Sequence, residues 1–233
     1  MFNSGCIICG NDLEYTDKDI SLSCSVCGKK FTTSVKCTNG HFVCDSCHQS
    51  EAVDYIENYC KNNFSKDPVK IATELMRNPK IKMHGPEHHF LVPAVLLTSY
   101  YNTIGTPEMI GEKINIAKSR AEKVPGGICG SCGNCGAGVG SGIFISTITK
   151  ATSLSEEPWK LSNLMTAKSL ENIANNGGPR CCKRDSYLAI QTAVEFLKNN
   201  FNVYLPVSEI ICEFSNMNKD CKKEACLFYK KSI

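Results

Sequence analysis

The first fifty residues carry Cys and His in closely spaced pairs, and these pairs constrain the fold more than any other feature. Four pairs follow one another, each with two or three residues between its members: Cys6 and Cys9, Cys24 and Cys27, Cys37 and His41, Cys44 and Cys47. Zinc binds four sulfur or nitrogen ligands in a tetrahedron, and a tight turn between paired ligands supplies two of them. The eight ligands therefore predict two zinc sites.

The segments between these pairs are short and polar, with a few apolar residues such as Ile20, Leu22, Phe31 and Val35. They indicate a small β module of the zinc-ribbon or finger type over residues 1–50. A unit of this size buries little apolar surface, so metal would supply much of its folding free energy. The spacing leaves two pairings open, sequential sites or an interleaved cross-brace.

The chain has 16 cysteines in 233 residues, a content that also occurs in secreted disulfide-bonded proteins. However, the N-terminus lacks a basic segment followed by an apolar stretch, and no apolar run is long enough to span a membrane. We therefore expect a cytoplasmic protein without membrane attachment, whose reduced thiols bind metal. The net charge of +3, without a long basic run, supports a nucleic-acid partner only weakly.

From residue 51 onward the apolar residues recur at helical spacing, which predicts a mainly α-helical domain over residues 51–233. Asp67 followed by Pro68 is a typical helix start, and Cys60 is expected in the core. A helix opened by Pro86 should be kinked or delayed by Pro93. Further helices are predicted over residues 51–62, 68–76, 108–123, 143–152, 159–175 and 185–200.

A glycine-rich stretch at residues 125–142 contains Cys129, Cys132 and Cys135 at every third position. This spacing matches the first three ligands of a bacterial ferredoxin run. Val139 stands where that run would place its fourth cysteine, so the fourth ligand must come from elsewhere. The loop predicts an iron–sulfur cluster, of the [4Fe–4S] type, completed by a distant cysteine.

Two adjacent cysteines, Cys181 and Cys182, lie among the cations Arg180, Lys183 and Arg184. Adjacent side chains point apart, so one thiol would bind the cluster while the other packs or reacts. The cations should lower the thiol pKa and attract an anionic ligand. We assign Cys181 to cofactor binding, and Arg180 and Arg184 to the cofactor site, where they would hold an anionic substrate. Cys182 is assigned to catalysis.

The C-terminal region holds three cysteines whose spacing is too irregular for a zinc knuckle, Cys212, Cys221 and Cys226. The spacing suits a site whose ligands converge from loops. Cys221 and Cys226 are predicted metal ligands, whereas Cys212 lies in an apolar stretch and is compatible with a core position.

Residues 84–89 contain three histidines and a glutamate, and this group is the best candidate for proton transfer. Histidine titrates near neutral pH, so His88 or His89, with Glu87, could move protons at the cluster. The residues could also bind metal. Alternatively, they form a polar helix start with capping and packing roles.

Several motifs together resemble an uncharacterised Cys-rich prokaryotic family, a domain of unknown function. They are residues 84–89, 123–129, 135–142, 178–184 and 212–214. The resemblance implies an origin in anaerobes and, for some members, association with a radical-SAM protein. It also implies that Cys132 is the least constant of the three cysteines in the glycine-rich stretch. Cys129 and Cys135 would then pair with Cys181 or Cys182 and with the three cysteines of the C-terminal region.

Three functions are compatible with these patterns. The first is an iron–sulfur enzyme of sulfur or redox metabolism that acts on a small anionic or sulfur-containing substrate. The second is a zinc-binding module without chemistry that docks RNA or protein. The third is an electron-transfer or maturation partner of a radical-SAM enzyme, which needs a cluster but no substrate pocket.

Overall fold

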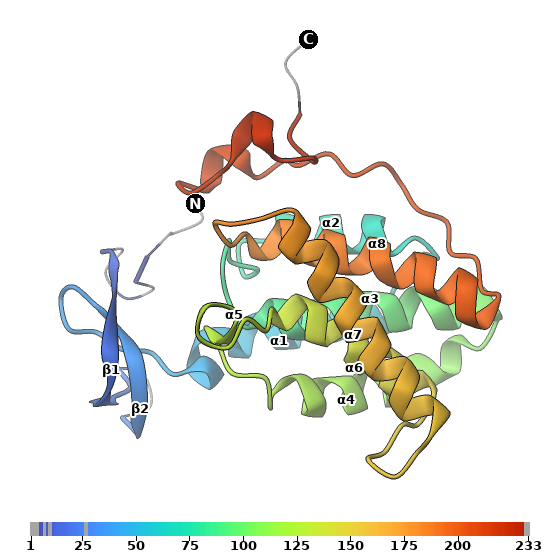
Figure 1. Cartoon of the computed structure of the whole chain (residues 1–233), viewed down its shortest axis with the longest axis horizontal. Helices are drawn as coiled ribbons and strands as arrows, with labels where there is room; N and C mark the ends of the chain where they lie inside the picture. The colour runs from blue at the N-terminus through green and yellow to red at the C-terminus, as the bar shows by residue number, and fades with distance from the viewer. Residues whose placement is uncertain (1–4, 7, 9–10, 26–27, 231–233) are drawn as a thin grey trace.

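The computed structural model describes residues 5–6, 8, 11–25 and 28–230. A two-stranded hairpin at the N-terminus stands beside a helical body (Figure 1). Strand β1 (Leu13–Ser23) pairs antiparallel with β2 (Lys30–Cys37), with a shift of register between Tyr15 and Ile20. The predicted fold class, mainly α with a small N-terminal β module, is confirmed.

The predicted helices are present, but some begin earlier than expected. α1 begins among the ligand pairs, α6 begins inside the glycine-rich stretch, and α8 begins at Cys182 instead of after Asp185. The first turns of these helices contain Cys, Gly or charged residues, so apolar periodicity does not mark them. The helices are α1 (Asp45–Lys61), α2 (Pro68–Arg77), α3 (Glu87–Ile104), α4 (Ile110–Ala121), α5 (Ile128–Ser131), α6 (Gly136–Ile148), α7 (Glu157–Asn175) and α8 (Cys182–Phe201), with 3-10 turns η1 (Pro107–Met109), η2 (Ser215–Met217) and η3 (Lys223–Ala225).

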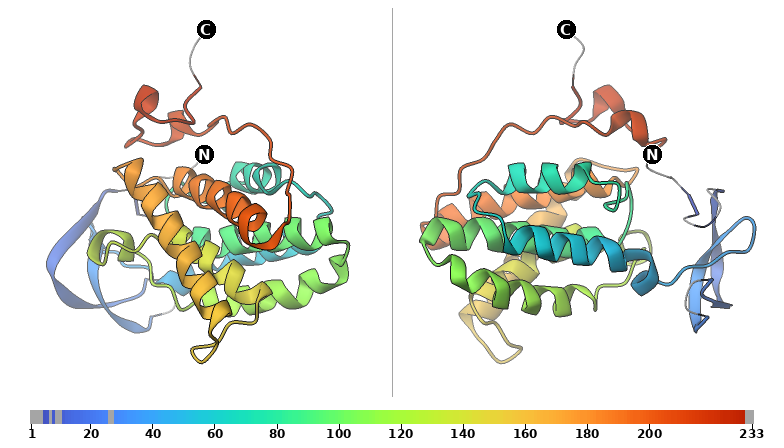
Figure 2. Two further views of the ribbon diagram at one scale, coloured as in Figure 1. Left: turned by 45° about the vertical axis from the view of Figure 1, so that its right-hand side comes forward. Right: turned by 180° about the vertical axis from the view of Figure 1, so that it is seen from behind.

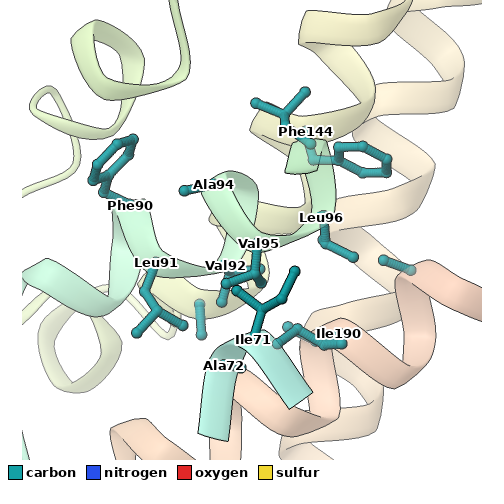
Figure 3. Packing of buried hydrophobic residues seen from close by; sticks show 14 of the residues in the cluster. Ile71, Ala72, Phe90, Leu91, Val92, Ala94, Val95, Leu96, Phe144 and Ile190 are labelled. Atoms are coloured by element: carbon teal, nitrogen blue, oxygen red, sulfur yellow. The ribbon is translucent and has the colours of Figure 1, made fainter. Parts of the chain in front are cut away.

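Helix α3 lies in the middle of the body and contacts α1, α2, α4, α6 and α8 (Figure 2). Its side chains are buried almost all round, and Figure 3 shows them meeting Ile71 of α2, Phe144 of α6 and Ile190 of α8. Pro93 lies inside α3 and does not delay its start. None of the described helices combines the length and apolar character that crossing a bilayer requires.

Glycine lets α6 approach its neighbours closely. A Cβ atom at Gly140 would lie 2.9 Å from the carbonyl oxygen of His89 and 3.0 Å from Cδ of Pro93 in α3. One at Gly142 would lie 1.9 Å from Oγ1 of Thr166 in α7. Helix α6 is therefore packed in close contact with both α3 and α7.

The chain reverses after α8 and returns across the body, above α2 and α8 in Figure 1. The reversal is at Asn202, which has a left-handed conformation with φ 53°. Along the return, the amide of Ser208 donates to Asp67 Oδ2 at 2.8 Å, and Phe214 and Phe228 are buried. This C-terminal segment, residues 202–230, brings Cys212, Cys221 and Cys226 back to the start of α8.

Candidate metal centres

The ligand pairs of the N-terminal module are interleaved. Two groups of three residues each place their ligand atoms within 4.8 Å of one another, so each group could hold a metal ion. This grouping follows the cross-brace and not the sequential pairing. Cys9 and Cys27, the predicted fourth ligands, lie outside the described residues. The two groups are Cys6, Cys37 and His41, and Cys24, Cys44 and Cys47.

Tight turns hold these thiols in place. Gly40, with φ +83°, donates its amide to the carbonyl oxygen of Cys37 at 2.7 Å, a turn that suits glycine. The amide of Asn39 lies 3.3 Å from Cys37 Sγ, and the amide of Cys44 lies 3.4 Å from Cys24 Sγ. Amide donors favour the thiolate over the thiol, which is the form that binds metal.

Two further features of the module fit a metal. The Nδ1 atom of His41 is buried, and among the described residues it has no hydrogen-bond partner. A buried nitrogen without a partner is costly unless a metal binds it. Cys44 is the N-cap of α1, and Cys47 lies in its first turn, where the helix dipole stabilises thiolates.

A second group of thiols forms where the glycine-rich loop meets the start of α8. Cys135 is close enough to both Cys129 and Cys182 for their charges to interact, and Arg180 interacts with Cys129 and Cys182. We call Cys129, Cys135 and Cys182 the loop thiols. Helix α6 starts directly after Cys135, and the amides of Ala137 and Gly138 in its first turn partly offset the rise in the pKa of that thiol that burial causes.

The middle cysteine of the glycine-rich stretch does not join this group. Cys132 is exposed, and its Sγ atom lies 3.6 Å from Oγ of Ser131. The resemblance to a ferredoxin run is therefore only partial in three dimensions.

The two adjacent cysteines face different groups. Cys181 lines a pocket together with Cys212, Cys221 and Cys226, and we call these four the C-terminal thiols. Cys182 lies near Cys135 instead, and so belongs to the loop thiols. No local signal separates the two roles, because the division depends on where the C-terminal segment returns.

The predicted lowering of thiol pKa values by the neighbouring cations is wrong for this pair. Burial raises the pKa of Cys181 to about 11 and raises that of Cys182 further, and the carboxylate of Asp185 adds to both rises. As free thiols they stay protonated, so Cys182 is not an activated nucleophile by itself. A bound metal ion would displace the proton.

Glu87 and His88 are fully buried rather than facing a substrate site. Glu87 Oε1 accepts from the amide of Lys82 at 2.9 Å. The ring of His88 contacts Oγ of Ser186 at 3.1 Å and the carbonyl oxygen of Lys82 at 3.0 Å. Burial lowers the pKa of His88 to about 3, so the ring is neutral. The geometry favours the alternative of capping and packing roles.

His89 lies beside the loop thiols. Its Nδ1 atom is 3.0 Å from the carbonyl oxygen of Val124, which can only accept, so Nδ1 carries the proton. Its ring edge packs against Gly136, where a Cβ atom would lie 2.2 Å from Nε2. Burial lowers the pKa of His89, which leaves Nε2 as a neutral acceptor against Gly136, the residue that follows Cys135.

The two arginines have different surroundings. Arg184 is buried and paired with the carboxylate of Asp185 at 3.0 Å, and it also donates to the carbonyl oxygen of Pro179. Arg180 is exposed, and it donates a hydrogen bond to the hydroxyl of Tyr15 at 3.2 Å. Arg180 is therefore the cation that an anion at the loop thiols would meet.

Comparison with known proteins gives a family but no relative with an assigned activity. No curated protein and no solved structure matches the chain. The model of a family of unknown function, DUF5714, matches residues 56–229, which include the loop thiols and the C-terminal thiols. The chain therefore belongs to the DUF5714 family.

Proposed function

We propose that the protein binds two zinc ions in its N-terminal module and an iron–sulfur cluster at the loop thiols, and that it is an enzyme of sulfur or redox metabolism. The convergence of Cys129, Cys135 and Cys182 carries this proposal. A [4Fe–4S] cluster is normally held by four cysteines. Three cysteines would leave one iron open to a substrate.

The separation of the thiols supports different metals in the two regions. A tetrahedral zinc ion with Zn–S bonds of about 2.3 Å places its sulfurs about 3.8 Å apart. The module's ligand atoms lie within 4.8 Å of one another, which is compatible with that arrangement. Among the described residues, sets of three candidate ligand atoms this close together occur only in the module. A cluster holds its thiolates farther apart, because each thiolate binds a different iron.

The surroundings of the loop thiols suit a small anionic substrate. Arg180 would bind its charge, because this guanidinium is exposed and close enough to Cys129 for that thiol to raise its pKa. His89 would accept a proton at Nε2, since Val124 holds the other ring nitrogen in its protonated form. The cluster would supply Lewis-acid or redox chemistry at its open iron.

Metal and sulfide analysis of protein purified without oxygen tests the proposal. We expect zinc from the module, and Cys129→Ser, Cys135→Ser and Cys182→Ser should each lose about four iron and four sulfide per chain. Cys132→Ser is the matched control, since it changes an exposed thiol of the same loop, and it should keep its iron. Zinc without sulfide, even after anaerobic reconstitution, would contradict the cluster.

A further inference from the structure

We infer that the four C-terminal thiols, Cys181, Cys212, Cys221 and Cys226, bind a separate metal centre that fastens the C-terminal segment to the start of α8. All four line a single pocket. The thiol of Cys212 raises the pKa of Cys181, and those of Cys221 and Cys226 raise the pKa of Cys212, as expected for thiols close together. This site does not depend on the cluster proposed at the loop thiols.

The local geometry of these thiols repeats that of the module's ligands. The amide of Phe214 lies 3.4 Å from Cys212 Sγ, and the amide of Lys223 lies 3.3 Å from Cys221 Sγ. In both cases the donor is two residues after the cysteine, as Asn39 is after Cys37. Amides that point at sulfur stabilise thiolates, so these turns are suited to metal ligands and not only to packing.

The charges around the pocket suit an anionic centre. Lys183 is buried and lines the pocket, with its Nζ atom 4.1 Å from the ring centre of Phe214. Arg184 and Lys222 also line the pocket. Four thiolates around one zinc ion or one [4Fe–4S] cluster leave an excess of negative charge, which these cations would balance.

The path of the chain gives the centre a mechanical role. Cys212 lies on an isolated parallel bridge to Tyr229, with its amide 2.7 Å from the carbonyl oxygen of Phe228. Cys221 and Cys226 flank η3. Only Cys181 belongs to the body, so one metal centre would join three points of the returning segment to α8. Among the described residues the four thiols form no group as tight as those of the module, which favours a cluster over a single zinc ion.

The test measures iron, zinc and sulfide in full-length protein purified without oxygen, together with hydrogen exchange in residues 202–230. Cys212→Ser and Cys226→Ser should each lose about four iron and four sulfide. Exchange in the segment should become at least tenfold faster, while the helical circular dichroism is retained. Cys132→Ser should change neither quantity. If Cys212→Ser does not fold, Cys221→Ser at a half-buried loop position replaces it.

The outcomes separate this centre from the one at the loop thiols. Loss of iron from the C-terminal variants but not from Cys129→Ser or Cys135→Ser would support the C-terminal centre alone. Loss of zinc instead of iron would support a four-thiolate centre and overturn its assignment as a cluster. Unchanged iron, zinc and sulfide in two folded C-terminal variants would overturn the centre itself.

Discussion

The N-terminal module and the helical body bury different kinds of atoms. In the module, most side chains of β1 and β2 are exposed, whereas the ligand thiols of Cys6, Cys24, Cys37 and Cys44 are only 1–4% exposed. In the body, α3 is enclosed by five helices. The loop thiols and the C-terminal thiols lie at the edge of the apolar core that these helices form. Metal would therefore take the place of an apolar core in the module, whereas the body has an extensive apolar core of its own.

The largest effect should follow from removing one ligand of the module. Cys24→Ser should lose one zinc ion and the amide protection of β1 and β2, with little change in helical circular dichroism. Structural zinc supplies about 10–16 kcal/mol of apparent binding free energy in zinc-finger peptides, far more than this hairpin can gain from packing. Metal analysis and hydrogen exchange would measure both losses.

The matched control for that variant is a cysteine of the body. Cys60 is fully buried in α1, and burial raises the pKa of its thiol to about 12, as expected for an apolar site. Cys60→Ala should keep both zinc ions and a protected hairpin, and should lower only the stability of the body. A hairpin that stays protected in Cys24→Ser would show that the module has a core after all.

Acid should destabilise the body through His88. Its pKa falls from 6.5 to about 3 on folding because burial disfavours the charged ring. Between these two pKa values the unfolded chain binds a proton at His88 and the folded chain does not. The contribution of His88 to the free energy of unfolding is therefore full above pH 6.5 and falls as the pH drops toward 3. In His88→Gln the dependence of unfolding on pH in this window should be less steep. An unchanged slope in urea titrations from pH 7 to pH 4.5 would argue that the ring is not buried neutral.

Close packing of α6 gives the next effect. Gly140→Ala should destabilise the body by about 1–3 kcal/mol, because the new methyl group would meet backbone and Pro93 atoms at about 3 Å. Gly111→Ala in α4 is the control, since a Cβ atom there meets nothing within 4 Å. It should stabilise the protein by about 0.5–1 kcal/mol, because alanine loses less entropy in a helix. Thermal unfolding of the two variants should therefore shift in opposite directions.

Local patterns predicted much of this structure, and tertiary arrangement accounts for the rest. Asp67 was recognisable as a helix cap, and its Oδ1 indeed accepts from the amides of Val69 and Lys70. In contrast, the division of Cys181 from Cys182 follows from the return of the C-terminal segment, which no spacing encodes. Cys212 lies in an apolar stretch that also suits a core residue, so only its neighbours in space identify it as a candidate ligand.

Asp67 also links the body to the C-terminal segment, because its Oδ2 accepts from the amide of Ser208. Asp67→Ala should cost about 1 kcal/mol or slightly more, since it removes a helix cap and this link together. Asp67→Asn retains acceptor oxygen for the cap and should cost less. Chemical denaturation would rank the two variants, and equal losses would indicate that the carboxylate charge matters more than its cap.

The smallest effect should come from the exposed ion pair between Arg77 and Glu213, whose side chains are 54% and 44% exposed. Glu213→Gln should cost less than about 1 kcal/mol, and salt should reduce the cost, because solvent screens such pairs. Glu213 is next to Cys212, so this variant probes the same part of the segment without touching a thiol. If Glu213→Gln loosened residues 202–230 as much as Cys212→Ser does, ion pairs would be holding the segment. If it leaves hydrogen exchange there unchanged, the thiols and the buried Phe214 and Phe228 hold the segment instead of this ion pair.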